Sequence, residues 1–397
     1  MNDSFFRRRM PTRGIVLTVM LCHFIAAFAA LGMPPFFALI LEKSLHNEAS
    51  YLAGWFYVVP TLFAALSSPW WGRLADRFGK KPMLIRAQIG LAASFLLAGF
   101  ANNTWTFFVA LVFQGLLGGT FAASNAYLAS VVNGKALIRS LTAMQWSARA
   151  ALVAAPVCLG LWASGESVIT LYRYLALLPL LAALLIACLP NCTTVGQTVE
   201  IVRVDALEEA TAREIYILQF AFVFATVVTF PYFITHVHQH FPDLSTSTAG
   251  LLFGLPHLVY LLLAMPLTRW IGKSRLIATA GLAHVALAAA IAGQIQPESL
   301  EWLVICRLVM GTAMTVGFIT LHALVASVVK SGTAGRTFGW FESSSKWGGV
   351  VAGVGAGLAA AGVGTNGPFI VGALVIMSAA VFAAFMTRGR LRLNKSY

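Results

Sequence analysis

Four ionisable side chains lie deep inside long apolar segments of this sequence, and their types and spacing suit ligand binding and proton transfer. Arg149, Arg307 and Lys346 are cations in such segments, and Glu342 precedes Lys346 by four residues. Residues four apart share one face of a helix, so Glu342 can pair with Lys346. A cation in an apolar segment can bind an anionic ligand through charge-assisted hydrogen bonds, and a carboxylate there can carry a proton. Both roles of Glu342, ion-pair partner and proton carrier, stay open.

Three nearby or comparable residues extend this candidate site. Gln145 and Trp146 precede Arg149 in the same segment, although helix packing explains Trp146 equally well. His23 lies in the middle of the first apolar segment, where it is either a hydrogen-bonded core residue or a proton carrier. The predicted substrate-binding set is therefore Arg149, Lys346, Arg307, Gln145 and Trp146, and the predicted proton-coupling pair is Glu342 and His23.

The elements that position these residues must be membrane-spanning helices. Of the 397 residues, 59% are hydrophobic and only 10% are charged, whereas an ordinary soluble domain carries about 25% charged residues. The five cysteines have no zinc-finger spacing, and no metal site is predicted. This composition excludes a soluble enzyme, a disordered chain and a secreted disulfide scaffold. It predicts an all-α, polytopic membrane protein.

Polar residues divide the chain into twelve predicted spans of a length suited to membrane-crossing helices. The ranges are 14–41, 51–71, 82–101, 105–132, 141–164, 168–189, 214–236, 247–268, 275–295, 300–328, 338–362 and 367–387. We expect an N-terminal tail (1–13), a six-helix bundle (14–189), a linker (190–213), a second six-helix bundle (214–387) and a C-terminal tail (388–397).

The basic residues predict how the chain is oriented. Of 27 lysines and arginines, 22 fall in segments on one side of the predicted membrane, and only Lys43 falls on the other side. Cytoplasmic loops of membrane proteins are enriched in Lys and Arg. We therefore expect a protein of the bacterial inner membrane with both termini on the cytoplasmic side. The net charge of +13 is therefore a topology signal and does not indicate nucleic-acid binding.

The two predicted bundles resemble each other in sequence. Gly115 corresponds to Gly311 at an offset of 196 residues, and Arg149 corresponds to Lys346 at an offset of 197. Parallel repeats of this kind are typical of transporters that bind their ligand between the two halves, near the membrane midplane. The repeat predicts that Arg149 and Lys346 face each other across a central cavity.

The turn after the second span has the sequence Gly-Arg-Leu-Ala-Asp-Arg-Phe-Gly-Lys-Lys-Pro, residues 72–82. It resembles motif A of the major facilitator superfamily, G-x-L-x-D-R-x-G-R/K-R/K, at every defined position. The resemblance implies two six-helix bundles and a cytoplasmic gate in which an aspartate engages a neighbouring helix N-terminus. The gate residues it implies here are Gly72, Asp76, Arg77, Gly79 and Lys80.

Two partial motifs refine the resemblance. Arg307 precedes Gly311 by four residues, as in motif B, and residues 155–160 resemble motif C of drug:proton antiporters. The overall pattern is similar to the drug-antiporter and sugar-efflux branch of the superfamily, including exporters of carboxylate and hydroxamate siderophores. The resemblance also implies a monomer that works by alternating access.

The function expected from the sequence is transport without enzymatic chemistry. The chain has no Walker A sequence or catalytic triad, so no cofactor is expected and a proton gradient is the expected energy source. The cationic excess among the candidate residues predicts a small polar or anionic substrate, such as an aerobactin-type citrate–hydroxamate siderophore. The alternatives are a multidrug:proton antiporter, a sugar or metabolite efflux protein and, remotely, a receptor or scaffold that does not transport.

Overall fold

The computed structural model describes residues 11–49, 51–132, 134–163, 165–191, 210–271, 275–328 and 334–393. All regular structure in these residues is helical, which confirms the predicted all-α class. Eight helical stretches within the described residues are long and apolar enough to cross a membrane, and Leu52–Ser68 and Leu276–Ala292 are shorter apolar helices. The protein is therefore a multi-pass membrane protein.

Contacts between backbone positions divide the chain into two compact units. Unit 1 comprises Met1–Ser50, Val59–Glu200 and Ser245–Leu251, and unit 2 comprises Tyr51–Val58, Ile201–Leu244 and Leu252–Tyr397. The units therefore do not follow chain order throughout, because each takes in the beginning of a helix that continues in the other. The predicted linker, 190–213, lies mostly outside the described residues.

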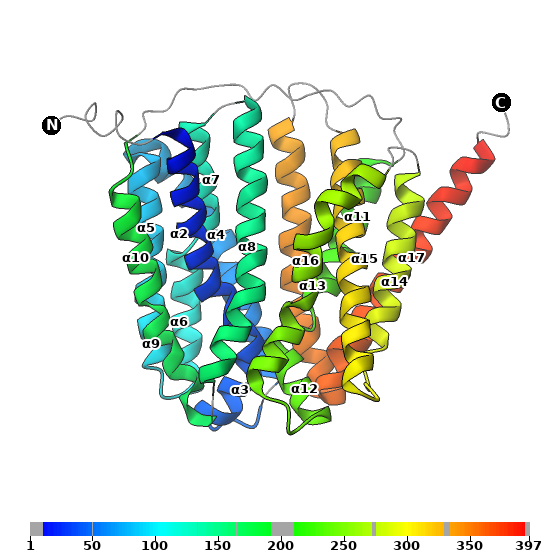
Figure 1. The fold of residues 1–397 in the computed structure, drawn as a ribbon, viewed down its shortest axis with the longest axis horizontal. Coiled ribbons are helices and arrows are strands. Elements are labelled where there is room, and N and C mark those ends of the chain that lie inside the picture. The colour runs from blue at the N-terminus through cyan, green and yellow to red at the C-terminus, as the bar shows by residue number, and fades with distance from the viewer. Residues whose placement is uncertain are drawn as a thin grey trace. The chain divides into compact units, whose positions relative to one another are not determined.

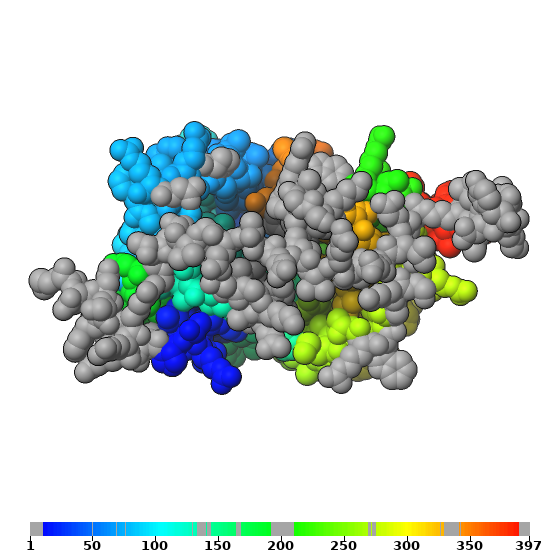
Figure 2. All heavy atoms as spheres, turned by 90° about the horizontal axis from the view of Figure 1, so that it is seen from above, coloured from blue at the N-terminus to red at the C-terminus, as the bar shows by residue number. Residues whose placement is uncertain are grey.

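Unit 1 holds most of the helices before the linker. They are α2 (Thr12–Gly32), η1 (Pro34–Phe36), α3 (Phe37–Leu39), η2 (Ile40–Ser44), most of α4 (Leu52–Phe78), α5 (Lys80–Gly99), α6 (Thr104–Leu117), α7 (Thr120–Val131), α8 (Gly134–Trp162), η3 (Gly165–Thr170), α9 (Leu171–Leu175) and α10 (Leu177–Ala187). Helix α10 packs against both α2 and α5 (Figure 1). The start of α2 and the α4–α5 turn lie at the same end of this unit (Figure 2).

The core of unit 1 shows why these helices associate. Val19 and Cys22 of α2, Leu84 of α5, Tyr127 of α7 and Met144 of α8 form one buried cluster. The hydroxyl of Tyr127 donates to the carbonyl of Pro190 at 2.9 Å, so its polar end is satisfied inside the core.

Unit 2 holds the later helices. They are α11 (Ala212–Val227), η4 (Phe230–Tyr232), α12 (Phe233–His240), most of α13 (Thr246–Trp270), α14 (Leu276–Ala292), α15 (Leu300–Ser327), α16 (Ala334–Val363), η5 (Gly364–Asn366) and α17 (Gly367–Leu393). Helix α14 packs against α15 and α17, and α11 packs against α16. Phe222, Phe233, Phe253 and Phe369 are among its fully buried side chains.

The predicted span 105–132 matches one apolar stretch, Thr104–Leu128, but its helix is interrupted. The range 105–132 was expected to be one helix, but it forms α6 and α7, separated by Gly118 and Gly119. Gly119 has a φ of 87°, a left-handed conformation that only glycine adopts readily. Hydropathy did not reveal the break because α6 and α7, the helices on either side of it, are both apolar.

Candidate functional site

Arg149 lies near the middle of α8 in unit 1. The face of α8 that packs into the unit carries the buried residues Met144, Ser147 and Ala151. Arg149 is only 8% exposed and makes contacts with the protein. Gln145, one turn earlier on the same face, is exposed, whereas Trp146 is half-buried. The structure therefore places Gln145 and Arg149 together on one face of α8, as their four-residue spacing predicts.

Lys346 lies near the middle of α16 in unit 2, on the side away from α11. The Ser344 hydroxyl donates to the Tyr216 carbonyl of α11 at 2.8 Å, and Gln219 Nε2 of α11 donates to Ser345 Oγ at 2.7 Å. Lys346 itself is exposed, and within the described part of the chain it forms no ion pair. The side chain of its predicted partner, Glu342, lies outside the described residues.

Arg307 of α15 is buried, with 3% of its surface exposed. Its Nε donates to the Leu252 carbonyl at 2.8 Å and one terminal nitrogen donates to the Phe253 carbonyl. The other terminal nitrogen lies 3.4 Å from Oε1 of Gln294, and the guanidinium lies 4.3 Å from the centre of the Phe233 ring. All of these groups belong to unit 2, so the guanidinium is enclosed by protein acceptors.

His23 is buried in α2 in unit 1, and its ring centre lies 5.1 Å from that of Phe121. Neither ring nitrogen has a hydrogen-bond partner among the described residues. A buried imidazole without a partner is costly unless a water molecule or a proton-carrying group serves it. Its role in proton coupling stays a prediction.

The predicted gate residues lie at the α4–α5 turn of unit 1. Gly79 has a φ of 99°, so glycine is required for the turn into α5. At Gly72, no atom of the described residues lies within 4 Å of where a Cβ would stand. Arg77 is exposed and lies 5.3 Å from the Phe78 ring centre. The side chain of Asp76 lies outside the described residues.

Lys80 lines a cavity of about 110 Å³ between α4, α5, α6 and α7, together with Trp71, Arg86 and Gly118. Trp71 Nε1 donates to the Leu116 carbonyl at 2.7 Å, and Arg86 donates to the Leu117 carbonyl at 2.6 Å. These two side chains cap the last carbonyls of α6 where the helix breaks, and a cation is favourable at a helix C-terminus. Sequence reasoning missed this pair, although the adjacent Gly118 and Gly119 were a signal of a helix end.

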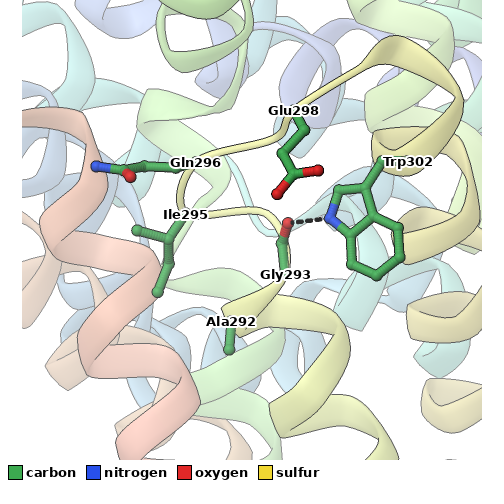
Figure 3. A pocket seen from close by; sticks show the side chains of 6 residues that line it. All are labelled: Ala292, Gly293, Ile295, Gln296, Glu298 and Trp302. Carbon is green, nitrogen blue, oxygen red and sulfur yellow. Dashed lines mark hydrogen bonds between the residues drawn. The ribbon is translucent and has the colours of Figure 1, made fainter.

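A second pocket, of about 340 Å³, lies at the loop between α14 and α15. Trp302 Nε1 donates to the Gly293 carbonyl at 2.9 Å, and the Glu298 carboxylate lies nearby (Figure 3). None of the residues predicted from the sequence lines this pocket. It is therefore a feature of the loop, separate from the candidate site.

Comparisons with known proteins decide the family. The family description "Major Facilitator Superfamily" matches residues 19–204 and 215–396. The chain belongs to the major facilitator superfamily. This confirms the resemblance inferred from motif A and agrees with a non-enzymatic protein.

Curated relatives within the superfamily match only part of the chain. The multidrug resistance protein MdtG of Salmonella arizonae is 37% identical over 122 residues, which is 30% of this chain and 30% of the relative. MdtG of Salmonella paratyphi B gives the same values. The match thus spans less than a third of these relatives.

Solved structures share the fold at low sequence identity. A mutant of the nucleoside transporter NupG has a TM-score of 0.76 at 13% identity, covering 94% of this chain and 99% of that one. The human organic anion transporter MFSD10 has a TM-score of 0.65 at 16% identity, covering 94% and 100%. At such identities the likeness concerns the superfamily fold alone.

Proposed function

We propose that this protein is a proton-coupled exporter of small organic anions that works by alternating access. The observation that carries the proposal is Lys346, an exposed cation near the middle of α16 in a member of the major facilitator superfamily. A lysine at the centre of a membrane helix costs about 2.5–3.5 kcal/mol when it faces lipid. That cost is avoided if Lys346 faces an aqueous, substrate-binding space.

The other proposed ligand-binding residues lie on α8. Arg149 corresponds to Lys346 in the internal repeat, and Gln145 shares its helical face. Guanidinium and amide groups donate to carboxylate and hydroxamate oxygens, and charge-assisted bonds are the stronger ones. Half-buried Trp146 adds an aromatic surface beside them. The particular substrate that we propose on this chemistry is a citrate–hydroxamate siderophore.

Multidrug efflux is the second candidate, and a specific observation favours it. The curated relatives that match 122 residues of the chain are named multidrug resistance proteins. In that case substrate recognition would depend mainly on apolar contacts in the binding pocket. The two candidates therefore differ in whether Lys346 and Arg149 are needed for transport.

Transport into proteoliposomes with an imposed pH gradient separates these candidates. Fluorescent organic anions and cationic dyes are compared for the wild type, Lys346→Gln and Lys346→Arg. We expect anion transport that falls at least tenfold in Lys346→Gln and is largely kept in Lys346→Arg, because the charge is what binds. Lys43→Gln is the matched control, since Lys43 is an exposed lysine paired with Glu42 at 3.3 Å.

Two outcomes contradict the anion proposal. Transport of cationic dyes alone supports multidrug efflux, and unchanged anion transport in Lys346→Gln removes the proposed ligand role. For the siderophore, the medium of iron-limited cells with and without the gene is profiled. Equal amounts of secreted siderophore exclude that substrate.

The proposal includes a topology. We place both termini in the cytoplasm because the basic residues gather on that side of the predicted spans. Reporter domains fused after residue 397 and inserted at Glu48 should be active on opposite sides of the inner membrane.

A further inference from the structure

Helix α13 contains two prolines in its interior, Pro256 and Pro266, and the first of them changes the hydrogen bonding of the backbone at a carbonyl that Arg307 binds. Pro256 has no N–H, so it cannot donate to the carbonyl four residues earlier, which belongs to Leu252. A carbonyl left without its partner in a membrane protein interior is costly. The Leu252 carbonyl is the group that Arg307 Nε binds at 2.8 Å. A terminal nitrogen of the same guanidinium binds the next carbonyl, that of Phe253, at 2.5 Å.

The same two helices also approach closely one turn further along α15. A Cβ at Gly311 would lie 2.8 Å from the Cα of Pro256 and 2.7 Å from the Cβ of Val259. Gly311 therefore lets the backbone of α15 reach the proline turn of α13, and Arg307 bonds the freed carbonyl of Leu252 and the adjacent carbonyl of Phe253. The two residues act on one turn of α13.

The internal repeat supplies a natural comparison in unit 1. Pro60 of α4 and Gly115 of α6 lie 196 residues before Pro256 and Gly311. They make the same approach, because a Cβ at Gly115 would lie 3.0 Å from the Cα of Pro60. The position that corresponds to Arg307 is Leu111, which is buried and has no donor. The proline–glycine crossing therefore forms without arginine, and the arginine adds something specific to α13.

The place of these bonds in the chain suggests what is added. Helix α13 begins in unit 1 and continues in unit 2, and the boundary falls between Leu251 and Leu252. On the unit 1 side, the Ser247 hydroxyl donates to the Val157 carbonyl of α8 at 3.0 Å. On the unit 2 side, the first two residues, Leu252 and Phe253, are the ones whose carbonyls Arg307 holds.

We infer that Arg307 is a positioning residue that fixes α13 where the helix enters unit 2, and that it does not bind substrate. The guanidinium is held by Leu252, Phe253 and Gln294 and lies against Phe233, so its donors are directed to protein groups. With these two carbonyls held, the turn of α13 around Pro256 keeps its place against α15 within unit 2.

Hydrogen exchange followed by mass spectrometry tests this inference without any substrate. We compare peptides that cover 252–262 in α13 with peptides that cover 56–66 in α4, for the full-length protein in lipid nanodiscs. In Arg307→Leu, exchange of the α13 peptide should become about tenfold faster, while the α4 peptide stays unchanged. In Arg307→Lys, exchange of the α13 peptide should be faster than in the wild type and slower than in Arg307→Leu, because lysine can donate to one carbonyl. Unchanged α13 exchange in Arg307→Leu would overturn the inference.

A double variant tests the link to the proline. Pro256→Ala restores an N–H that can donate to the Leu252 carbonyl, so it should remove most of the need for Arg307. Exchange of the α13 peptide in Pro256→Ala/Arg307→Leu should be several-fold slower than in Arg307→Leu alone. If the double variant exchanges as fast as Arg307→Leu, the carbonyl that Pro256 frees is not the reason for the arginine. The double variant also keeps the test usable if Arg307→Leu folds poorly.

Transport kinetics give a readout that rests on the proposed function. A positioning residue should lower the turnover number in Arg307→Lys and leave the KM for substrate within about twofold. A raised KM with an unchanged turnover number would assign Arg307 to substrate binding and overturn the inference. If the wild type transports none of the tested compounds, the proposed function fails, while the exchange measurements still decide the role of Arg307.

Discussion

The hydroxyl of Tyr232 accepts a hydrogen bond of 2.8 Å from the amide of Gly54, 178 residues away in the sequence. The same hydroxyl donates to the carbonyl of Tyr51. Gly54 lies in the first turn of α4, where backbone amides have no partner within the helix. Tyr232 is only 1% exposed, so this long-range cap is shielded within unit 2.

Removing the hydroxyl should therefore weaken unit 2. We expect Tyr232→Phe to lower the free energy of unfolding by about 0.5–2 kcal/mol, the usual loss for a helix N-cap. Thermal unfolding of the purified protein in detergent measures the effect. Tyr174→Phe is the control because Tyr174 is 70% exposed. Equal stability of the two variants would show that the cap contributes nothing.

The same turn of α4 packs closely on α16 within unit 2. A Cβ at Gly54 would lie 2.5 Å from the amide nitrogen of Gly357 and 2.6 Å from the Gly353 carbonyl oxygen. Backbone atoms cannot move aside as a flexible side chain can, so Gly54→Ala should force the helices apart. We expect a loss of about 1–3 kcal/mol in the free energy of unfolding.

Gly362→Ala is the matched control for Gly54→Ala, because no atom of the described residues lies within 4 Å of a Cβ at Gly362. Both variants lose the same backbone flexibility and gain the same methyl group. If thermal unfolding shows the same loss of stability in both variants, the close α4–α16 packing is not rigid.

The break between α6 and α7 gives a third prediction. Gly119 has a φ of 87° with open space around a Cβ, so alanine would meet backbone strain but no clash. We expect Gly119→Ala to cost about 1–2 kcal/mol of folding free energy, the penalty for a left-handed residue with a side chain. Gly349→Ala, also in open space but in an ordinary helical conformation, should cost much less. Thermal unfolding compares the two, and equal losses would contradict a strain at Gly119.

Proton coupling is predicted to depend on Glu342. Glu342→Gln removes the group that can exchange a proton and keeps the shape of the side chain. Transport driven by a pH gradient should be lost, whereas exchange of substrate between the two sides without a gradient should persist. The measurement is proton movement and substrate flux in proteoliposomes. Full proton-driven transport in the variant would mean that Glu342 is only an ion-pair partner. The same measurement on His23→Gln would then test whether His23 carries the proton.

The class of fold followed from the sequence because insertion of a helix into a membrane depends on the summed hydrophobicity of one local stretch of residues. About twenty consecutive apolar residues suffice for a span, whatever surrounds them. The same holds for motif A, whose Gly79 is needed by the turn in which it lies. The repeat between Gly115 and Gly311 was also visible from the sequence, and both glycines make the same close approach to a proline.

Only the tertiary structure decided which distant groups meet. The charge of Arg307 and its depth in an apolar segment predict a ligand-binding role, and they do not reveal which protein acceptors surround the side chain. Its donors reach carbonyls that lie 54 and 55 residues earlier in the chain. The bond between Tyr232 and Gly54 spans still more. Such pairs depend on how helices cross, and helix crossing is set by side-chain packing across the whole unit, which no local pattern encodes.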